Sequence, residues 1–205
     1  MSHTAHAIPS YTPYGAGQLK GRARGALICG FFGGVWMFEA VFFGGIATAA
    51  WLTIATLATI AFIAWPVAQL RALRGLSNTQ ADRQRWSSIS TLYWTDFVLE
   101  WVCCGIAVAW LVHVRRFDLI PQAVGIIIGL HFVPLAILFK APIYYVTAAA
   151  LVFGSLGSLF IPAGDVRNLA ACAMNGLALW ATAAVNLYRN RSRAGEERLP
   201  AAKMV

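Results

Sequence analysis

Charged side chains are scarce in this sequence, and acidic ones are the scarcest. Only 12% of the 205 residues are charged, and Asp and Glu together number 8, whereas soluble domains carry about 25% charged residues. Hydrophobic residues make up 59% of the chain. Apolar runs of about 20 residues recur along it, and this length spans a hydrocarbon core of about 30 Å. The composition excludes a soluble globular domain and predicts a multi-pass helical membrane protein.

Cysteine patterns and catalytic motifs are also lacking. The four cysteines lie in apolar runs without Cys-x-x-Cys spacing, which indicates buried apolar side chains rather than disulfides or a zinc site. There is no Walker A, G-x-S-x-G, H-E-x-x-H or G-x-G-x-x-G motif. Haem is not expected, because a b-type haem usually needs two axial histidines at matched depth and a single histidine lies deep in a run. We therefore expect no metal and no cofactor.

Six apolar runs, separated by short polar or basic segments, predict one all-α domain, a bundle of six transmembrane helices. The predicted spans are residues 25–46, 47–72, 88–113, 121–139, 143–161 and 168–188. Residues 1–24 are polar and turn-rich, which indicates a disordered tail that ends in basic residues. Residues 189–205 form a basic C-terminal tail. Pro66 and Pro134 fall inside spans, and each is expected to kink its helix because proline removes a helical hydrogen bond.

Basic residues concentrate on one side of this predicted topology. With the N-terminus inside, 13 of the 16 Lys and Arg residues fall in inner segments, and the other three are Arg115, Arg116 and Arg167. By the positive-inside rule, we expect both termini to lie in the cytoplasm. The expected location of the protein is the inner (plasma) membrane. The same distribution accounts for the net charge of +8 without nucleic acid, and it predicts contact with anionic lipid at the cytoplasmic face.

Five polar side chains interrupt the apolar runs near the middle of the membrane: Glu39, Asp96, Glu100, His131 and Asn175. Asp96 and Glu100 are four residues apart and therefore share one helix face. At a rise of about 1.5 Å per residue, Asp96 lies about 12 Å and Glu100 about 18 Å from the inner end of their span, and His131 lies about 15 Å from either face. We predict that Glu100 and His131 lie within direct or one-water reach, with Asp96 on the same internal face and nearer the cytoplasm.

Buried ionisable groups are costly in a bilayer and usually mark ion or substrate paths. Three acids and one imidazole cannot all be charged there, so a carboxyl must hold a proton or pair with His131. The first hypothesis is a small transporter or channel for a proton, cation or small solute. Two alternatives stay open. One is a non-catalytic accessory or assembly subunit, in which these groups only form interhelical hydrogen bonds. The other is a lipid-modifying membrane enzyme, although the missing motifs argue against catalysis.

Two glycine pairs have G-x-x-x-G spacing, Gly30 with Gly34 and Gly125 with Gly129. Such pairs allow close helix contact, and they could also serve as faces for a homo-oligomer or a membrane-protein partner.

The segment Gly-Leu-His-Phe-Val-Pro-Leu begins at Gly129 and is followed by Phe139 and by the tyrosines at 144 and 145. It resembles a segment of uncharacterised bacterial multi-pass membrane proteins with a G-x-H-x-x-P core. The resemblance implies that His131 and Pro134 belong together, and it implies no activity.

Overall fold

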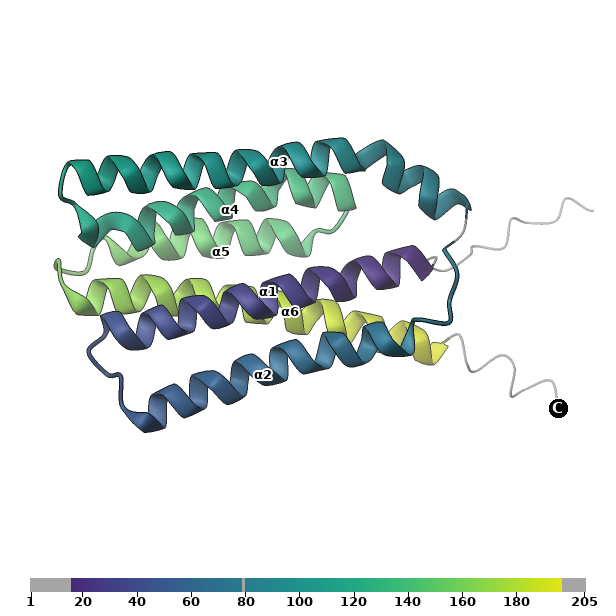
Figure 1. Ribbon diagram of the computed structural model, residues 1–205, viewed down its shortest axis with the longest axis horizontal. Helices are drawn as coiled ribbons and strands as arrows, with labels where there is room; N and C mark the ends of the chain where they lie inside the picture. Colours follow the sequence, from purple (N-terminus) through teal and green to yellow (C-terminus); the bar gives the residue numbers. More distant parts are fainter. Residues whose placement is uncertain (1–15, 79, 197–205) are drawn as a thin grey trace, which may run out of the picture.

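The computed structural model describes residues 16–78 and 80–196. These residues form six α-helices, one short 3₁₀-helix and no strand (Figure 1). In chain order they are α1 (Ala16–Phe43), α2 (Ala49–Ala72), α3 (Gln80–His113), η1 (Phe117–Leu119), α4 (Ile120–Phe139), α5 (Ile143–Ser158) and α6 (Asp165–Glu196). Consecutive α-helices run in opposite directions, so the start of α1 and the end of α6 lie at the same end of the bundle, on the right in Figure 1.

Five of these helices are long and apolar enough to cross a membrane. The exception is α5, which has 16 residues and is therefore about 24 Å long, against about 30 Å for a hydrocarbon core. The chain is accordingly a multi-pass membrane protein with an all-α fold.

Three helices extend beyond the apolar runs that predicted them. α1 begins at Ala16, inside the predicted disordered tail, and residues 1–15 of that tail lie outside the described residues. α3 begins at Gln80 rather than at residue 88, and α6 continues into the predicted C-terminal tail as far as Glu196. The reason is that hydropathy marks where a helix enters lipid, whereas its backbone hydrogen bonds continue in water when the residues have adequate helix propensity.

The boundaries of the last two predicted spans also differ from the observed ones. α5 ends at Ser158 rather than at residue 161, and α6 begins at Asp165 rather than at residue 168. Pro66 and Pro134 lie inside α2 and α4, which continue as helices through both prolines.

Glycines produce the closest contact between α1 and α6. A Cβ atom added at Gly176 would lie 2.8 Å from Cγ of Met37 and 3.0 Å from the carbonyl oxygen of Gly33. Trp180 of α6 crosses the same interface and donates its indole N–H to the carbonyl of Gly30 at 3.1 Å. Only residues without a Cβ allow the two backbones to approach in this way.

Both predicted G-x-x-x-G pairs lie inside the bundle. Gly30 and Gly34 of α1 face Phe62 and Thr59 of α2, and Gly125 and Gly129 of α4 face side chains of α5 and α6. The chain's own helices therefore cover these glycine faces.

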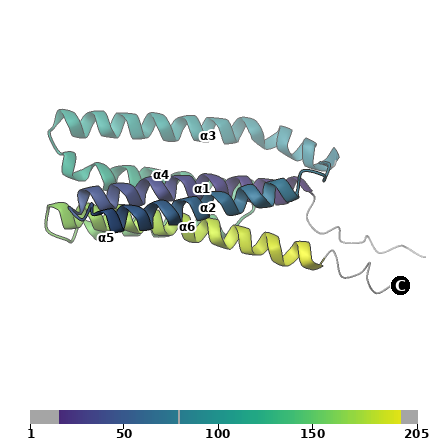
Figure 2. The ribbon, with the colours of Figure 1, turned by 60° about the horizontal axis from the view of Figure 1, so that its bottom comes forward.

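α3 lies apart from this packed group. It has 34 residues and none of them is buried, and it packs mainly against α4. Figure 2 shows it as a separate layer above the other helices. Large aromatic side chains point outward from it, and Trp94, Trp101 and Trp110 are 54–64% exposed. α4 thus has the packed helices on one side and α3 on the other.

Candidate functional site

Three of the predicted site residues come together between α3 and α4. Nδ1 of His131 lies 2.9 Å from Oδ2 of Asp96, and Nε2 of His131 lies 3.5 Å from Oε2 of Glu100. One carboxylate therefore faces each nitrogen of the imidazole. The side chains are only 11% exposed for His131 and 15% for each acid. The distance between Glu100 and His131 agrees with the direct reach expected from the sequence. We call Asp96, His131 and Glu100 the triad.

Helix geometry explains this arrangement. Asp96 and Glu100 are one turn apart and lie on the side of α3 that faces α4. Tyr93 lies on the same side, and its ring packs against Phe139 of α4 with centroids 6.0 Å apart. His131 projects from α4 toward the gap between the two acids, so that a single imidazole contacts both turns of α3.

The number of protons on the triad decides whether both of its contacts are favourable. A neutral imidazole has one N–H and one lone pair, whereas an imidazolium has two N–H groups. A contact between nitrogen and a carboxylate oxygen is favourable only when a proton lies between the two atoms. Two contacts therefore need two protons, either both on His131 or one on His131 and one on a carboxyl group. Both distributions leave the triad with one negative charge, which a third proton or a monovalent cation would neutralise.

His131 and Asp96 lie close together, but their contact does not have the geometry of a hydrogen bond. Oδ2 of Asp96 and Nδ1 of His131 are both buried, and neither makes a hydrogen bond, although they lie within ion-pair distance. Hydrogen bonds weaken steeply when donor and acceptor are poorly aligned. Both atoms therefore remain available to accept or donate a proton.

The geometry favours proton chemistry over metal binding. Among the residues that the structure describes, no group of three His, Cys, Asp or Glu side chains is arranged to hold a metal ion. In the triad the reason is that the two imidazole nitrogens point in different directions. The two carboxylates therefore cannot converge with His131 on one ion.

The other two predicted site residues lie elsewhere, so the single five-residue cluster is corrected to three residues. Glu39 of α1 is half-buried, and its Oε2 lies 4.0 Å from Sγ of Cys172 on α6. Asn175 of α6 is fully buried and accepts a hydrogen bond from Oγ of Ser155 on α5 at 3.2 Å. The prediction rested on depth alone, and depth does not determine which neighbour a helix face meets.

Most of the buried polar side chains on α6 were not predicted. Three of the buried polar side chains on α6, including the predicted Asn175, are spaced seven residues apart, which keeps them on one helix face. Each of the three pairs with a side chain of α4 or α5. The pairs are Asn168 with Gln122 at 3.3 Å, Asn175 with Ser155 at 3.2 Å and Thr182 with Thr147 at 2.6 Å. The seven-residue spacing was the available sequence signal. We call these six residues the α6 stripe.

The bundle is also tied at its two ends. At one end, Asn190 of α6 donates to the carbonyl of Leu19 at 3.0 Å and to Oε1 of Gln69 at 3.3 Å, which joins α1, α2 and α6. At the other, the buried Arg167 of α6 binds the carboxylate of Asp118 in η1. These ties hold the ends of the packed helices together.

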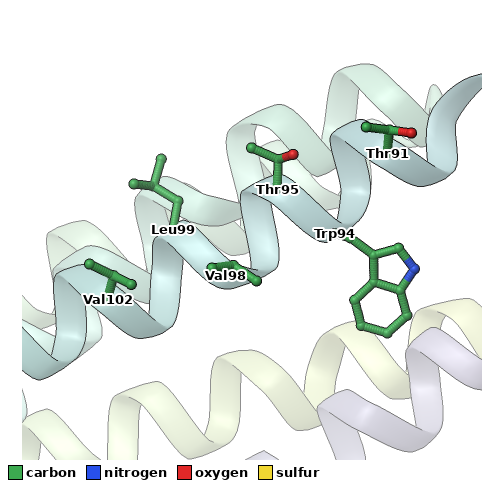
Figure 3. A pocket seen from close by; sticks show the side chains of 6 residues that line it. All are labelled: Thr91, Trp94, Thr95, Val98, Leu99 and Val102. Atoms are coloured by element: carbon green, nitrogen blue, oxygen red, sulfur yellow. The ribbon is translucent and has the colours of Figure 1, made fainter.

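An apolar groove on α3 is separate from the triad. It has a volume of about 640 Å³ and is lined by Thr91, Trp94, Thr95, Val98, Leu99 and Val102, which all come from α3 (Figure 3). By helical phase these residues lie away from the strip that carries Asp96 and Glu100. The groove is therefore not part of the polar site.

Residues 90–189 are similar to a family of unknown function (DUF7010). The matched region contains the whole triad and the whole α6 stripe, whereas Glu39 lies outside it. No curated protein and no solved structure matches the chain.

Proposed function

We propose that the protein is a small transporter or channel of the bacterial inner membrane that moves a proton, or a cation or small solute together with a proton, by way of the triad. The observation that carries the proposal is the imidazole of His131 between two carboxylates at 2.9 and 3.5 Å. Ionisable groups placed together at membrane depth are typical of proton relays.

The chemistry of the triad supports proton exchange in particular. The two protons of the triad have two distributions of equal net charge, so a proton can pass between His131 and an acid without changing the charge of the site. Pro134 has no N–H, so the carbonyl of Leu130 lacks its helical donor beside His131. This carbonyl offers a further acceptor next to the relay.

The proposed topology has six spans with both termini in the cytoplasm. Basic residues support it, because the end of the bundle that holds the start of α1, the loop between α2 and α3 and the end of α6 carries most of them. Anionic lipid would then lie against this end. Reporter fusions at each terminus should be active only with a cytoplasmic reporter, and a periplasmic signal from either one contradicts the topology.

Proton flux into liposomes tests the function directly. Purified protein is reconstituted with a trapped pH-sensitive dye, and a pH gradient is imposed with the membrane potential clamped. We expect the intact chain to dissipate the gradient and Glu100→Gln to abolish that flux, because the amide keeps the shape of the side chain but cannot titrate.

Glu39→Gln is the matched control for this assay. It removes a carboxylate at a similar depth that is not in contact with the triad, and it should retain most of the flux. Equal flux from the intact chain and Glu100→Gln, with both folded by circular dichroism, would overturn the relay.

A second candidate function, an accessory or assembly subunit, is favoured by a different observation. No residue of α3 is buried, and its exposed tryptophans form a surface that a partner helix could cover. In that case a partner should co-purify with the intact chain and be lost from Trp101→Ala and Trp94→Ala variants. The absence of flux together with such a partner would favour this function over transport.

A further inference from the structure

Three basic side chains surround a second cavity, far from the triad in sequence. A space of about 290 Å³ is lined by Lys20 and Arg24 of α1, Leu70 of α2 and Arg74 in the turn after α2. Both helix ends lie at the end of the bundle where the basic residues collect. We call these four residues the inner basic pocket.

The helices bring the charges of this pocket close to one another. Lys20 and Arg24 are four residues apart and therefore lie one above the other on α1. Nζ of Lys20 donates a hydrogen bond to the carbonyl of Leu76 at 2.5 Å, which links α1 to the segment that follows α2. This bond holds Lys20 beside the cavity, whereas Arg24 and Arg74 are exposed.

In the part of the chain that the structure describes, no carboxylate lines the pocket. Asp82, at the start of α3, accepts the backbone N–H of Gly17 at 3.3 Å. Like charges held near one another repel, and a bound anion relieves this repulsion. Three cations suit an anionic group such as a phosphate, and Leu70 adds one apolar wall.

We propose that the inner basic pocket binds the phosphate headgroup of an anionic phospholipid from the cytoplasmic leaflet. The proposal rests on the proposed orientation, which places this end of α1 and α2 at the level of the headgroups, and it is independent of proton transport. Basic pockets between transmembrane helices on the cytoplasmic side are suited to such headgroups. The apolar surfaces of α1 and α2 next to the pocket allow the acyl chains to remain in the membrane.

Lipid titration in detergent tests the proposal without any transport assay. Delipidated protein is titrated with phosphatidylglycerol, with phosphatidylcholine and with inorganic phosphate, and binding is followed by native mass spectrometry and thermal shift. We expect phosphatidylglycerol to bind and the other two probes to bind much more weakly. The triple variant Lys20→Gln, Arg24→Gln, Arg74→Gln should weaken phosphatidylglycerol binding by about 10- to 100-fold at low salt.

A matched variant separates a specific pocket from diffuse charge. Arg83→Gln, Arg85→Gln and Arg191→Gln together remove the same charge from exposed positions at the same end, and this triple variant should bind phosphatidylglycerol within about twofold of the intact chain. Equal weakening in both triple variants overturns the pocket. Equal binding of inorganic phosphate and phosphatidylglycerol overturns the lipid as its ligand. Proton flux measured on the same pocket variant keeps a failure here distinct from a failure of the transport proposal.

Discussion

The two sides of α4 use polar side chains in different ways. Toward α5 and α6 the polar groups are neutral amides and hydroxyls, buried and paired, in an interface where Gly125 and Gly129 allow close contact. Toward α3 the polar groups are two acids and an imidazole, and no residue of α3 is buried. Neutral hydrogen bonds between membrane helices contribute about 0.6–2 kcal/mol each whatever the pH. The contact with α3 depends instead on where protons reside.

The helices on the two sides of α4 are therefore held by different kinds of contact. α1, α2, α5 and α6 form the stable part of the bundle together with one side of α4. α3 is held against α4 by the triad and by apolar contacts such as the ring contact between Tyr93 and Phe139. Changing the protons of the triad should therefore change how firmly α3 is bound.

The largest effect is expected from His131→Leu. This change leaves two carboxylates on one face of α3 without the imidazole that contacts both of them, and breaking a buried ion pair in this way costs about 3–5 kcal/mol. Cysteine labelling in detergent can locate the damage, because Cys103 and Cys104 lie on α3 while Cys29 and Cys172 are buried in the packed part. We expect labelling of the α3 pair to accelerate and that of the buried pair to change little.

Neutralising the acids should rescue this variant. In an Asp96→Asn, Glu100→Gln background, His131→Leu no longer leaves charge behind, so its cost should fall to about 1 kcal/mol. An undiminished cost in that background would mean that His131 stabilises the protein by packing alone.

The next largest difference in stability is expected between valine substitutions at a closely packed glycine and at an open one. Gly176→Val places new atoms against Met37 and the Gly33 backbone, and overpacking of this kind costs about 1–3 kcal/mol. Gly105→Val on α3 meets open space and should change thermal stability by less than about 0.5 kcal/mol. Similar losses in both variants would mean that α3 is packed as tightly as α6.

A double-mutant cycle on the α6 stripe should show a smaller effect. Ser155→Ala and Asn175→Leu each break one neutral hydrogen bond, and the coupling between them should be about 0.6–2 kcal/mol. Thermal unfolding at pH 5 and pH 8 should give the same coupling, because neither side chain titrates. A coupling that changes with pH would remove the contrast with the triad.

The smallest effect is expected at the end of the bundle. Arg116 makes an exposed ion pair with Asp118 at 3.1 Å, and Arg116→Gln should cost about 0.2–1 kcal/mol or less. Arg167→Gln removes a buried partner of the same carboxylate. It should lower the free energy of unfolding by more than Arg116→Gln does, as measured by thermal unfolding. Equal costs would show that burial at this end does not matter.

The sequence predicted those features that depend on hydropathy and spacing along one helix. The apolar runs predicted six helices, and the spacing of Asp96 and Glu100 placed both on one face. The contact with His131 followed from matched depth on neighbouring helices. Glu39 and Asn175 were grouped with them wrongly, because depth says nothing of the direction in which α1 and α6 turn their faces. That direction is set by the glycine contacts between those helices, which are visible only in the packed structure.

The shortness of α5 has a consequence for the surrounding lipid. On the six-span topology its 16 residues cover about 24 Å, so the hydrocarbon layer is thicker than the helix on this side by about 6 Å. The residues after Ser158, among them the 92% exposed Phe160, leave the α-helix, although the N–H groups of residues 159–161 still donate to the carbonyls of residues 156–158. On this topology, local thinning of the bilayer beside α5 would meet the difference. Such hydrophobic mismatch makes the protein sensitive to acyl chain length, with lipids of shorter chains gathering along this one flank of the bundle.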